Sequence, residues 1–206
     1  MNGNPRFVGL LMSALVLVGC STGNQQAQQQ AIDTMSTPFA GGAITLQLRA
    51  EPGLNTFNDL PNSCTVLLVQ AANNSALDKV LNNPVTVKSL FAGAGGEGDV
   101  LQVDRYVMMP GQSNTLHIDR AINTRSIALV AGYYPFPAKQ HMFRMDIPVE
   151  TKRYGWFSSE WQASLMPVTL TVVLGKVGIV DASRSDKQTD QATQVPADSS
   201  SMEDNQ

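Results

Sequence analysis

Hydrophobic and polar residues alternate with a period of two along most of the middle of the chain. In residues 44–48 three aliphatic side chains alternate with polar ones, which predicts a strand with one buried face. Residues 65–70 and 127–134 are apolar almost without a break, as expected of strands at the centre of a sheet. Many short strands with turn residues between them predict an all-β sandwich over residues 43–181.

One segment follows a helical period instead. Asn74 is a good helix cap, and apolar residues follow at spacings of i, i+3 and i+4 in residues 77–81. Asn82-Asn83-Pro84 ends this helix, and a second helical turn can continue over 85–91. Helices this short are not stable alone and must pack on the sheet. We therefore predict a short helical insertion between strands two and three of the sandwich.

The next predicted strand, residues 101–108, changes parity part-way. Leu101 and Val103 alternate with polar residues. Farther along the strand the apolar residues are Tyr106 and Met108, which have the opposite parity. Such a change predicts a bulge or bend near Arg105.

The N-terminal residues have the pattern of an exported lipoprotein. Arg6 is the only charge before an apolar run over residues 7–19, which suits a signal peptide and is too short to span a bilayer. The run ends in Leu17-Val18-Gly19-Cys20, which resembles the bacterial lipobox, where the cysteine thiol accepts diacylglycerol. We predict a lipoprotein signal peptide over residues 1–19 and lipidation of Cys20.

The residues on either side of the predicted sandwich are polar. Ser21, in place of an Asp, points to the outer membrane, with the protein facing the periplasm. Acyl chains on Cys20 would be a stable anchor in that membrane. Residues 20–42 then form a flexible tether, and residues 182–206 form a disordered polar tail, because neither can bury enough apolar surface to fold.

Composition limits the possible partners. The chain is 43 % hydrophobic and 15 % charged, with a net charge of −3 and no basic run, which argues against nucleic acid as a partner. With Cys20 lipidated, Cys64 is the only thiol left, so no internal disulfide can form. A small buried residue at the start of a strand is the favoured interpretation of Cys64, and pairing with another chain remains open.

Motifs for catalysis or metal binding are weak. Glycines in residues 93–98 match G-x-G-x-x-G, but a helix precedes them and a strand follows, which is the reverse of a dinucleotide site. His117 and His141 lack further ligands at zinc spacing and are interpreted as surface histidines. We expect no enzyme activity, no catalytic residue, no metal and no cofactor. The enzymatic alternative is an envelope hydrolase that uses Cys64 or one of the histidines.

The segment 51–63 is long for a connection between neighbouring strands. It carries three large apolar residues, Leu54, Phe57 and Leu60, among turn formers, with a proline near each end. If the loop projects, these side chains need a partner to cover them. If it folds back, they form a lid on the sandwich, and the residues alone leave both possibilities open.

A cluster of aromatic residues lies farther along the chain. It comprises Tyr154, Trp156, Phe157 and Trp161, flanked by Lys152 and Arg153. Tryptophan is enriched in binding hot spots, but packing at a sheet edge is the favoured interpretation here.

In their order and spacing these parts resemble the TssJ (SciN-like) family, the outer-membrane lipoproteins of type VI secretion systems. The resemblance covers the lipobox and residues 44–181. It rests on a strand followed by a long loop and on four short motifs in sequence: Val66 to Val69, Ala76-Leu77-Asp78, Met109-Pro110-Gly111-Gln112 and Val130-Ala131-Gly132-Tyr133. The chain departs from the family pattern at residues 70–73, where Gln-Ala-Ala-Asn replaces a leucine-rich strand end.

The resemblance implies a transthyretin-like sandwich without enzyme activity. It implies that the protein binds the periplasmic C-terminal domain of the inner-membrane protein TssM, and so tethers a complex of TssJ, TssL and TssM to the outer membrane. The contact would be made by the loop between strands one and two, here through Leu54, Asn55, Phe57, Asp59, Leu60 and Pro61. The alternative is a lipid-anchored sandwich that carries a small apolar ligand in an internal pocket.

Overall fold

The structure is a computed structural model that describes residues 19–96, 98–134, 138–156 and 160–185. Its elements, in chain order, are α1 (Gly19–Thr34), β1 (Ala40–Ala50), β2 (Cys64–Ala71), α2 (Asn74–Leu81), α3 (Pro84–Phe91), β3 (Val100–Met108), β4 (Ser113–Arg120), β5 (Ser126–Ala131), η1 (Lys139–His141), β6 (Met142–Asp146), β7 (Val149–Tyr154), β8 (Glu160–Leu165), β9 (Val168–Leu174) and β10 (Ile179–Arg184).

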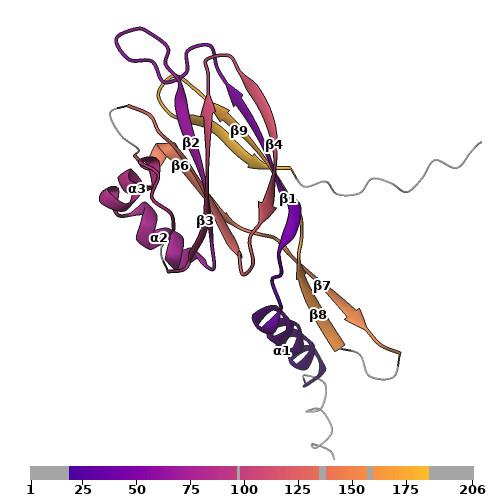
Figure 1. Cartoon of the computed structure of the whole chain (residues 1–206). Helices are drawn as coiled ribbons and strands as arrows, with labels where there is room; N and C mark the ends of the chain where they lie inside the picture. The colour runs from indigo at the N-terminus through magenta and orange to yellow at the C-terminus, as the bar shows by residue number, and fades with distance from the viewer. Residues whose placement is uncertain (1–18, 97, 135–137, 157–159, 186–206) are drawn as a thin grey trace, which may run out of the picture.

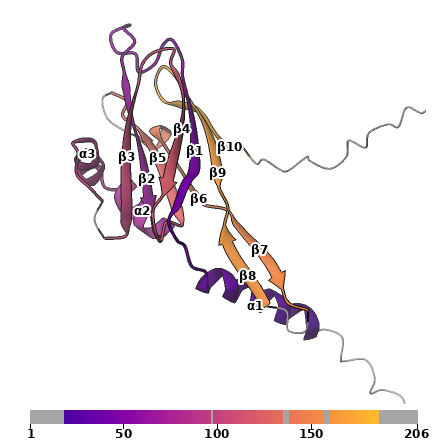
Figure 2. The same ribbon diagram turned by 45° about the vertical axis from the view of Figure 1, so that its right-hand side comes forward.

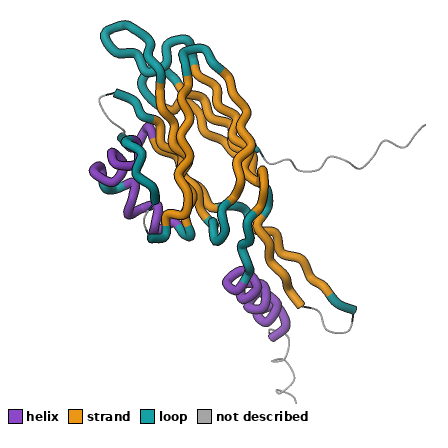
Figure 3. The backbone as a smooth tube through the Cα atoms, in the orientation of Figure 1, coloured by secondary structure: helices purple, strands orange, loops and turns teal. Residues whose placement is uncertain are grey.

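Two four-stranded sheets face each other and form a β-sandwich (Figures 1 and 3). One sheet has the strand order β10-β9-β1-β4, in which β1 and β9 run parallel and the other neighbours are antiparallel. The other sheet has the order β3-β2-β5-β6 and is antiparallel throughout. The predicted β-sandwich with a short helical insertion between strands two and three is confirmed.

The main hydrophobic core lies between the two sheets. Alternate residues of β1, from Ile44 to Leu48, point into it and meet residues of β9 such as Leu170. The opposite sheet contributes Val66 and Leu68 from β2. This is the one-sided burial that the alternating pattern predicts for β1.

A second core lies on the outer face of the β3-β2-β5-β6 sheet, under α2 and α3. Leu67 and Val69 of β2 and Val130 of β5 pack there against Leu77 of α2 and Leu90 of α3. Because β2 and β5 are covered on both faces, their sequences are apolar without alternation. The two helices supply the second cover (Figure 1).

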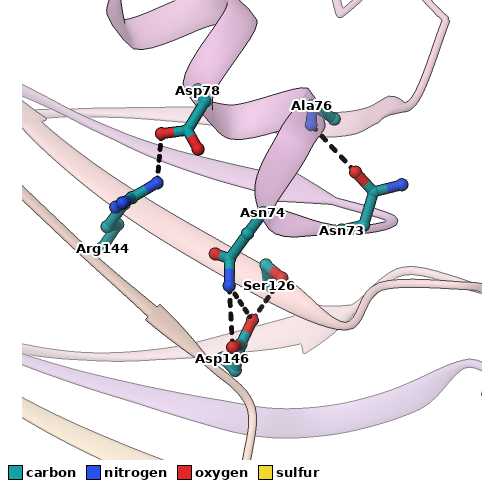
Figure 4. A network of polar contacts seen from close by, with 7 residues as sticks. All are labelled: Asn73, Asn74, Ala76, Asp78, Ser126, Arg144 and Asp146. Atoms are coloured by element: carbon teal, nitrogen blue, oxygen red, sulfur yellow. Dashed lines mark hydrogen bonds and ion pairs between the residues drawn. The ribbon is translucent and has the colours of Figure 1, made fainter.

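Polar side chains fix α2 to the sheet edge, as Figure 4 shows. The helix cap is Asn73, one residue earlier than predicted, and its side chain accepts a hydrogen bond from the backbone N–H of Ala76 at 2.9 Å. Asn74 instead donates to the carboxylate of Asp146 on β6 at 2.7 Å, and Ser126 of β5 donates to the same carboxylate. An ion pair between Asp78 of α2 and Arg144 of β6 completes the connection.

The bulge predicted near Arg105 was wrong. Pairing between β2 and β3 keeps one register from Met108 to Gln102, and the irregularity lies one step beyond. The parity changes because the two faces of β3 contact different cores: Val103, partly buried, packs under the helices, while Tyr106, also partly buried, packs on the main core. Arg105 itself donates from Nε to the backbone carbonyl of Leu90 at the end of α3, at 2.9 Å.

The segment predicted as a flexible tether contains a 16-residue helix, α1, so the prediction of local disorder was wrong there. Alanine and glutamine give this segment adequate helix propensity. Helix α1 packs along the β7–β8 hairpin, which extends beyond the sandwich (Figure 2). The two elements cover each other, and that contact stabilises a helix that composition alone does not predict to fold.

At the other end of the chain, β10 continues to Arg184 and pairs with β9, so the sandwich extends three residues past the predicted boundary at 181. The rest of the predicted polar tail, from 186, and the signal peptide up to residue 18 lie outside the described residues. Within the described part of the chain, no helix is both long enough and apolar enough to cross a bilayer.

Candidate partner-binding site

The loop between β1 and β2 forms one end of the sandwich, opposite the end where α1 enters β1 (Figure 1). Its base is held by two neighbouring loops. The backbone N–H of Thr56 donates to the carbonyl of Lys176 at 3.0 Å, and the N–H of Gly111 donates to the carbonyl of Glu51 at 3.2 Å. The loop is therefore a fixed part of the fold.

Leu54 and Asn55 fix the conformation of the loop from inside. The side chain of Leu54 has no exposed surface and belongs to the main core. Asn55 is buried and has a φ of 45°, a conformation that asparagine tolerates better than most residues. Its amide donates to the carbonyl of Ser63 at 2.8 Å and accepts from the backbone N–H of Tyr134 at 3.0 Å.

The tip of the loop is a tight hairpin that presents apolar groups. Phe57 and Leu60 exchange two backbone hydrogen bonds, of 2.9 and 3.1 Å. Between them Asn58 and Asp59 both have positive φ, as a type I′ turn requires. Phe57 is 45 % exposed and Leu60 is 68 % exposed, so both side chains are presented to solvent by a rigid turn.

Tyr134 extends this apolar surface from a different loop. Its ring lies against that of Phe57, with the centroids 4.4 Å apart, and it is 63 % exposed. The two rings border an open hollow together with Asn55 and Asn62. Sequence reasoning did not find Tyr134, because nothing in the chain places residue 134 beside residue 57. We call Phe57, Leu60 and Tyr134 the docking surface.

The predicted contact residues therefore divide into two groups. Phe57, Asp59, Leu60 and Pro61 are exposed. Leu54 and Asn55 are buried, so a direct contact role does not fit them: they support the loop from below. The sequence left open whether the loop projects or folds back on the sandwich, and each alternative holds for part of it. Leu54 folds back into the core, whereas Phe57 and Leu60 project into solvent.

His141 is buried, so its interpretation as a surface histidine was wrong. Its Nδ1 accepts from the backbone N–H of Ala138 at 2.8 Å, and its Nε2 lies 2.9 Å from the carbonyl of Val177. The ring packs on Tyr133, with centroids 4.8 Å apart. His141 thus joins η1 to the turn before β10. His117 is exposed on β4, and the described residues hold no group of three or more His, Cys, Asp or Glu side chains placed to bind a metal.

Cys64 is the first residue of β2 and is buried, as predicted. Burial raises the pKa of its thiol to about 12, against a smaller opposing effect of a hydrogen bond with the backbone of Gly132. Burial and the raised pKa both make the thiol a poor nucleophile. Cys64 therefore serves packing in this fold.

Among the described residues of the aromatic cluster, Tyr154 and Trp156 are not packed as the sequence favoured. Trp156 is 94 % exposed and Tyr154 is also exposed, while Trp161 is half-buried. Phe157 lies outside the described residues. Packing was the wrong interpretation for Trp156, because the β7–β8 hairpin extends past the sandwich and leaves its far end without a neighbouring sheet.

A sequence profile of the T6SS-SciN family, described as "Type VI secretion lipoprotein, VasD, EvfM, TssJ", matches residues 42–173. This range spans β1 to β9 and includes the loop with Phe57 and Leu60. The chain belongs to this family of type VI secretion lipoproteins. No sequence among curated proteins matches this lipoprotein significantly.

Solved structures resemble the lipoprotein at low sequence identity. TssJ1 from Pseudomonas aeruginosa has 17 % identity over 72 % of this chain and 97 % of its own, with a TM-score of 0.44. Lip from Serratia marcescens, a membrane-bound component of the type VI secretion system, has 18 % identity over 66 % of this chain and 94 % of its own, with a TM-score of 0.45. A structure named as the TssM C-terminal domain from EAEC has 20 % identity over 66 % of this chain and 99 % of its own, with a TM-score of 0.43.

Proposed function

We propose that this lipoprotein tethers the type VI secretion membrane complex to the outer membrane by binding the periplasmic C-terminal domain of TssM. In this proposal acyl chains on Cys20 hold one end of the protein in the periplasmic leaflet of the outer membrane. The docking surface at the opposite end binds TssM, an inner-membrane protein that forms the complex together with TssL. The role is mechanical, without a catalytic step or a cofactor.

The observation that carries the proposal is the exposure of Phe57 and Leu60 on a hydrogen-bonded turn. Large apolar side chains on a rigid, projecting turn are the usual anchors of a protein interface, because little entropy is lost when they are buried. Tyr134 adds an aromatic ring whose hydroxyl end can stay hydrated at the rim. Leu54 and Asn55 hold the turn in place before the partner arrives.

The proposal is tested with the double variant Phe57→Ser, Leu60→Ser and the purified periplasmic domain of TssM from the same cells. Loss of two apolar anchors is expected to weaken binding by at least about thirty-fold, corresponding to about 2 kcal/mol. The fold is expected to remain intact because neither side chain belongs to the core. Isothermal titration calorimetry measures the affinity, and circular dichroism checks the fold.

Ile122→Ser is the matched control. Ile122 is an aliphatic residue with 60 % exposure, close to that of Leu60, and it lies in the turn that follows β4 at the other end of the sandwich. This variant is expected to bind with unchanged affinity. Equal affinity of the double variant and wild type would refute the loop assignment.

The alternative, a carrier of a small apolar ligand, needs a cavity inside the sandwich. The space between the sheets is instead occupied by the buried side chains of the main core. The hollow beside Phe57 and Tyr134 is open to solvent and suits the edge of a protein interface. These features favour docking over ligand transport.

A further inference from the structure

The β7–β8 hairpin carries both tryptophans of the protein, Trp156 and Trp161. It forms a two-stranded sheet of its own, with α1 packed along it. At its far end Trp156 and Tyr154 are exposed, and Trp156 has almost its whole surface in contact with solvent. Two exposed aromatic side chains at one end of the hairpin are candidates for contact with a partner, because tryptophan and tyrosine are enriched at protein and membrane interfaces.

The position of the hairpin relative to α1 identifies what that partner is. The side chain of Gln28 in α1 donates a hydrogen bond to the Thr151 hydroxyl in β7 at 2.6 Å. Cys20 precedes Gln28 by eight residues, which is about 12 Å of helix. Tyr154 follows Thr151 by three residues, which is about 10 Å of strand. The first turn of α1 and the far end of the hairpin therefore lie at a similar distance from the contact between Gln28 and Thr151.

Figures 1 and 2 both show the N-terminal end of α1 beside the far end of the hairpin, pointing away from the sandwich. Acyl chains on Cys20 would enter the membrane from the first turn of α1. The exposed aromatic residues would then meet the surface of the same leaflet. The loop that carries Phe57 and Leu60 lies at the other end of the molecule and would face away from that surface.

The side chains at the hairpin end suit the region of lipid headgroups. Tryptophan and tyrosine concentrate at membrane interfaces because their rings are apolar and their N–H and O–H groups stay hydrated. Lys152 and Arg153 are exposed beside them and can reach headgroup phosphates. Lys152 also pairs with Glu150 at 3.0 Å, so the aromatic rings rather than the net charge carry the argument.

We propose that the end of the β7–β8 hairpin, through Tyr154 and Trp156, rests in the headgroup layer of the leaflet that holds the acyl chains of Cys20. The lipid anchor and the hairpin would together make two contacts with the membrane and hold the sandwich at a fixed orientation, with the docking surface directed into the periplasm. This inference rests on the proposed lipid anchoring of the protein.

The test uses the full acylated protein with the substitution Trp161→Phe, which leaves Trp156 as its single tryptophan. It is reconstituted in vesicles of phosphatidylethanolamine and phosphatidylglycerol, with or without bromine atoms on the acyl chains. Brominated lipids are expected to reduce the emission of Trp156 roughly by half and to leave an emission maximum at shorter wavelength than in buffer. Emission that is unchanged by brominated lipids and fully quenched by aqueous iodide would overturn the proposal.

Trp156→Phe is the matched control, because it leaves Trp161. Trp161 pairs with Arg153, two residues after Thr151, so it lies on the hairpin face that α1 covers. Brominated lipids are expected to quench the emission of Trp161 much less than that of Trp156. The fraction of emission quenched in wild type, which has both tryptophans, is expected to lie between the fractions in the two variants. Equal quenching of both tryptophans would contradict the assignment to the exposed end.

Vesicle flotation distinguishes a failure of lipid anchoring through Cys20 from a failure of the contact between the hairpin and the membrane. Protein that floats with the vesicles while Trp156 stays accessible to iodide would leave the anchor intact and overturn the hairpin contact. Protein that does not float would overturn lipid anchoring and the hairpin contact with it. Protection of Trp156 that grows with protein density, without quenching by brominated lipids, would point to contact between protein molecules and overturn the membrane contact.

Discussion

Gln70 shows how one buried polar residue can define a junction. It lies near the end of β2 with no exposed surface, and its amide donates to the carbonyl of Asp119 at 2.8 Å. Its side-chain carbonyl accepts from the backbone N–H of Ala121 at 2.9 Å and from the hydroxyl of Thr124 at 3.1 Å. The glutamine thereby forms hydrogen bonds with the turn between β4 and β5, which accounts for a polar residue at position 70.

We expect Gln70→Leu to lower the free energy of unfolding by about 2–4 kcal/mol, because it removes the partner of the buried Thr124 hydroxyl and of partly buried backbone groups of Asp119 and Ala121. Chemical denaturation with urea measures the effect. The control is Gln162→Leu, since Gln162 is exposed on β8, and a change within about 0.5 kcal/mol is expected there. Equal stability of Gln70→Leu and wild type would show that the three hydrogen bonds contribute nothing net.

Cys64 gives a prediction about reactivity. Burial raises its pKa from 9.0 to about 12. At pH 8 the folded protein therefore holds much less thiolate than the unfolded chain, and only the thiolate attacks a disulfide reagent. We expect labelling by an aromatic disulfide reagent to be slower in the native protein by on the order of a hundredfold to a thousandfold, and its rate to keep rising as the pH is raised above 9.

The comparison for this measurement is the same protein in concentrated guanidinium, where the Cys64 thiol titrates near its ordinary pKa. Native labelling as fast as labelling of the unfolded chain would contradict the buried position. Slow labelling would also answer a question left open by the sequence, because a thiol with this burial cannot pair readily with another chain.

At the scale of elements, the sequence predicted those whose packing is visible in their own residues. The alternation in β1 and the continuous apolar runs of β2 and β5 identified strands with one and two buried faces. The asparagine and proline signals around α2 and α3 located both helices to within a residue. The parity change in β3 does not indicate a bulge, because a strand that contacts a different core with each face can change parity without one.

What the sequence could not predict depends on contacts between distant segments. Helix α1 is weakly amphipathic and is stabilised by the β7–β8 hairpin, which lies more than a hundred residues later. Tyr134 joins the docking surface only because β5 ends beside the loop that carries Phe57. Leu54 and Leu60 have similar sequence surroundings, and only the fold shows that one is buried and the other is exposed.

The position of α1 gives a prediction at this scale. Arg125, in the turn before β5, donates to the backbone carbonyls of Ile32 at 3.3 Å and Met35 at 3.1 Å, at the C-terminal end of α1. We expect Arg125→Ala to loosen α1 because these carbonyls lose their donors and a favourable positive charge near the helix C-terminus. Hydrogen exchange should become faster in residues 23–35 while the sandwich keeps its protection.

Arg49→Ala is the control for Arg125→Ala, because Arg49 is an exposed arginine on β1, far from α1. It is expected to leave exchange in α1 unchanged. If Arg125→Ala also left that exchange unchanged, the two hydrogen bonds would not hold the helix. If it accelerated exchange in β1 and β2 as well, Arg125 would support the whole sandwich.

At the scale of the whole molecule, the two attachments of the proposed tether lie at opposite ends. Helix α1, whose first turn contains Cys20, and the β7–β8 hairpin extend from one end, and the loop between β1 and β2, which carries Phe57 and Leu60, lies at the other (Figure 2). A force between the two membranes would therefore pass through the sandwich. Both β1, which leads from α1 to the loop, and β9, which follows the hairpin, lie in the middle of the same sheet and pair in parallel.

Because the two ends share no side chain, their functions should be separable. We expect Cys20→Ser to remove the protein from the outer-membrane fraction while the purified chain keeps its affinity for the periplasmic domain of TssM. Phe57→Ser combined with Leu60→Ser should give the reverse result, normal fractionation with weak binding. Membrane fractionation and calorimetry on the same set of variants measure both properties. A loop variant that left the membrane fraction, or a Cys20 variant that lost affinity, would mean that the two ends are coupled through the fold, and the tether could not then be treated as two independent attachments.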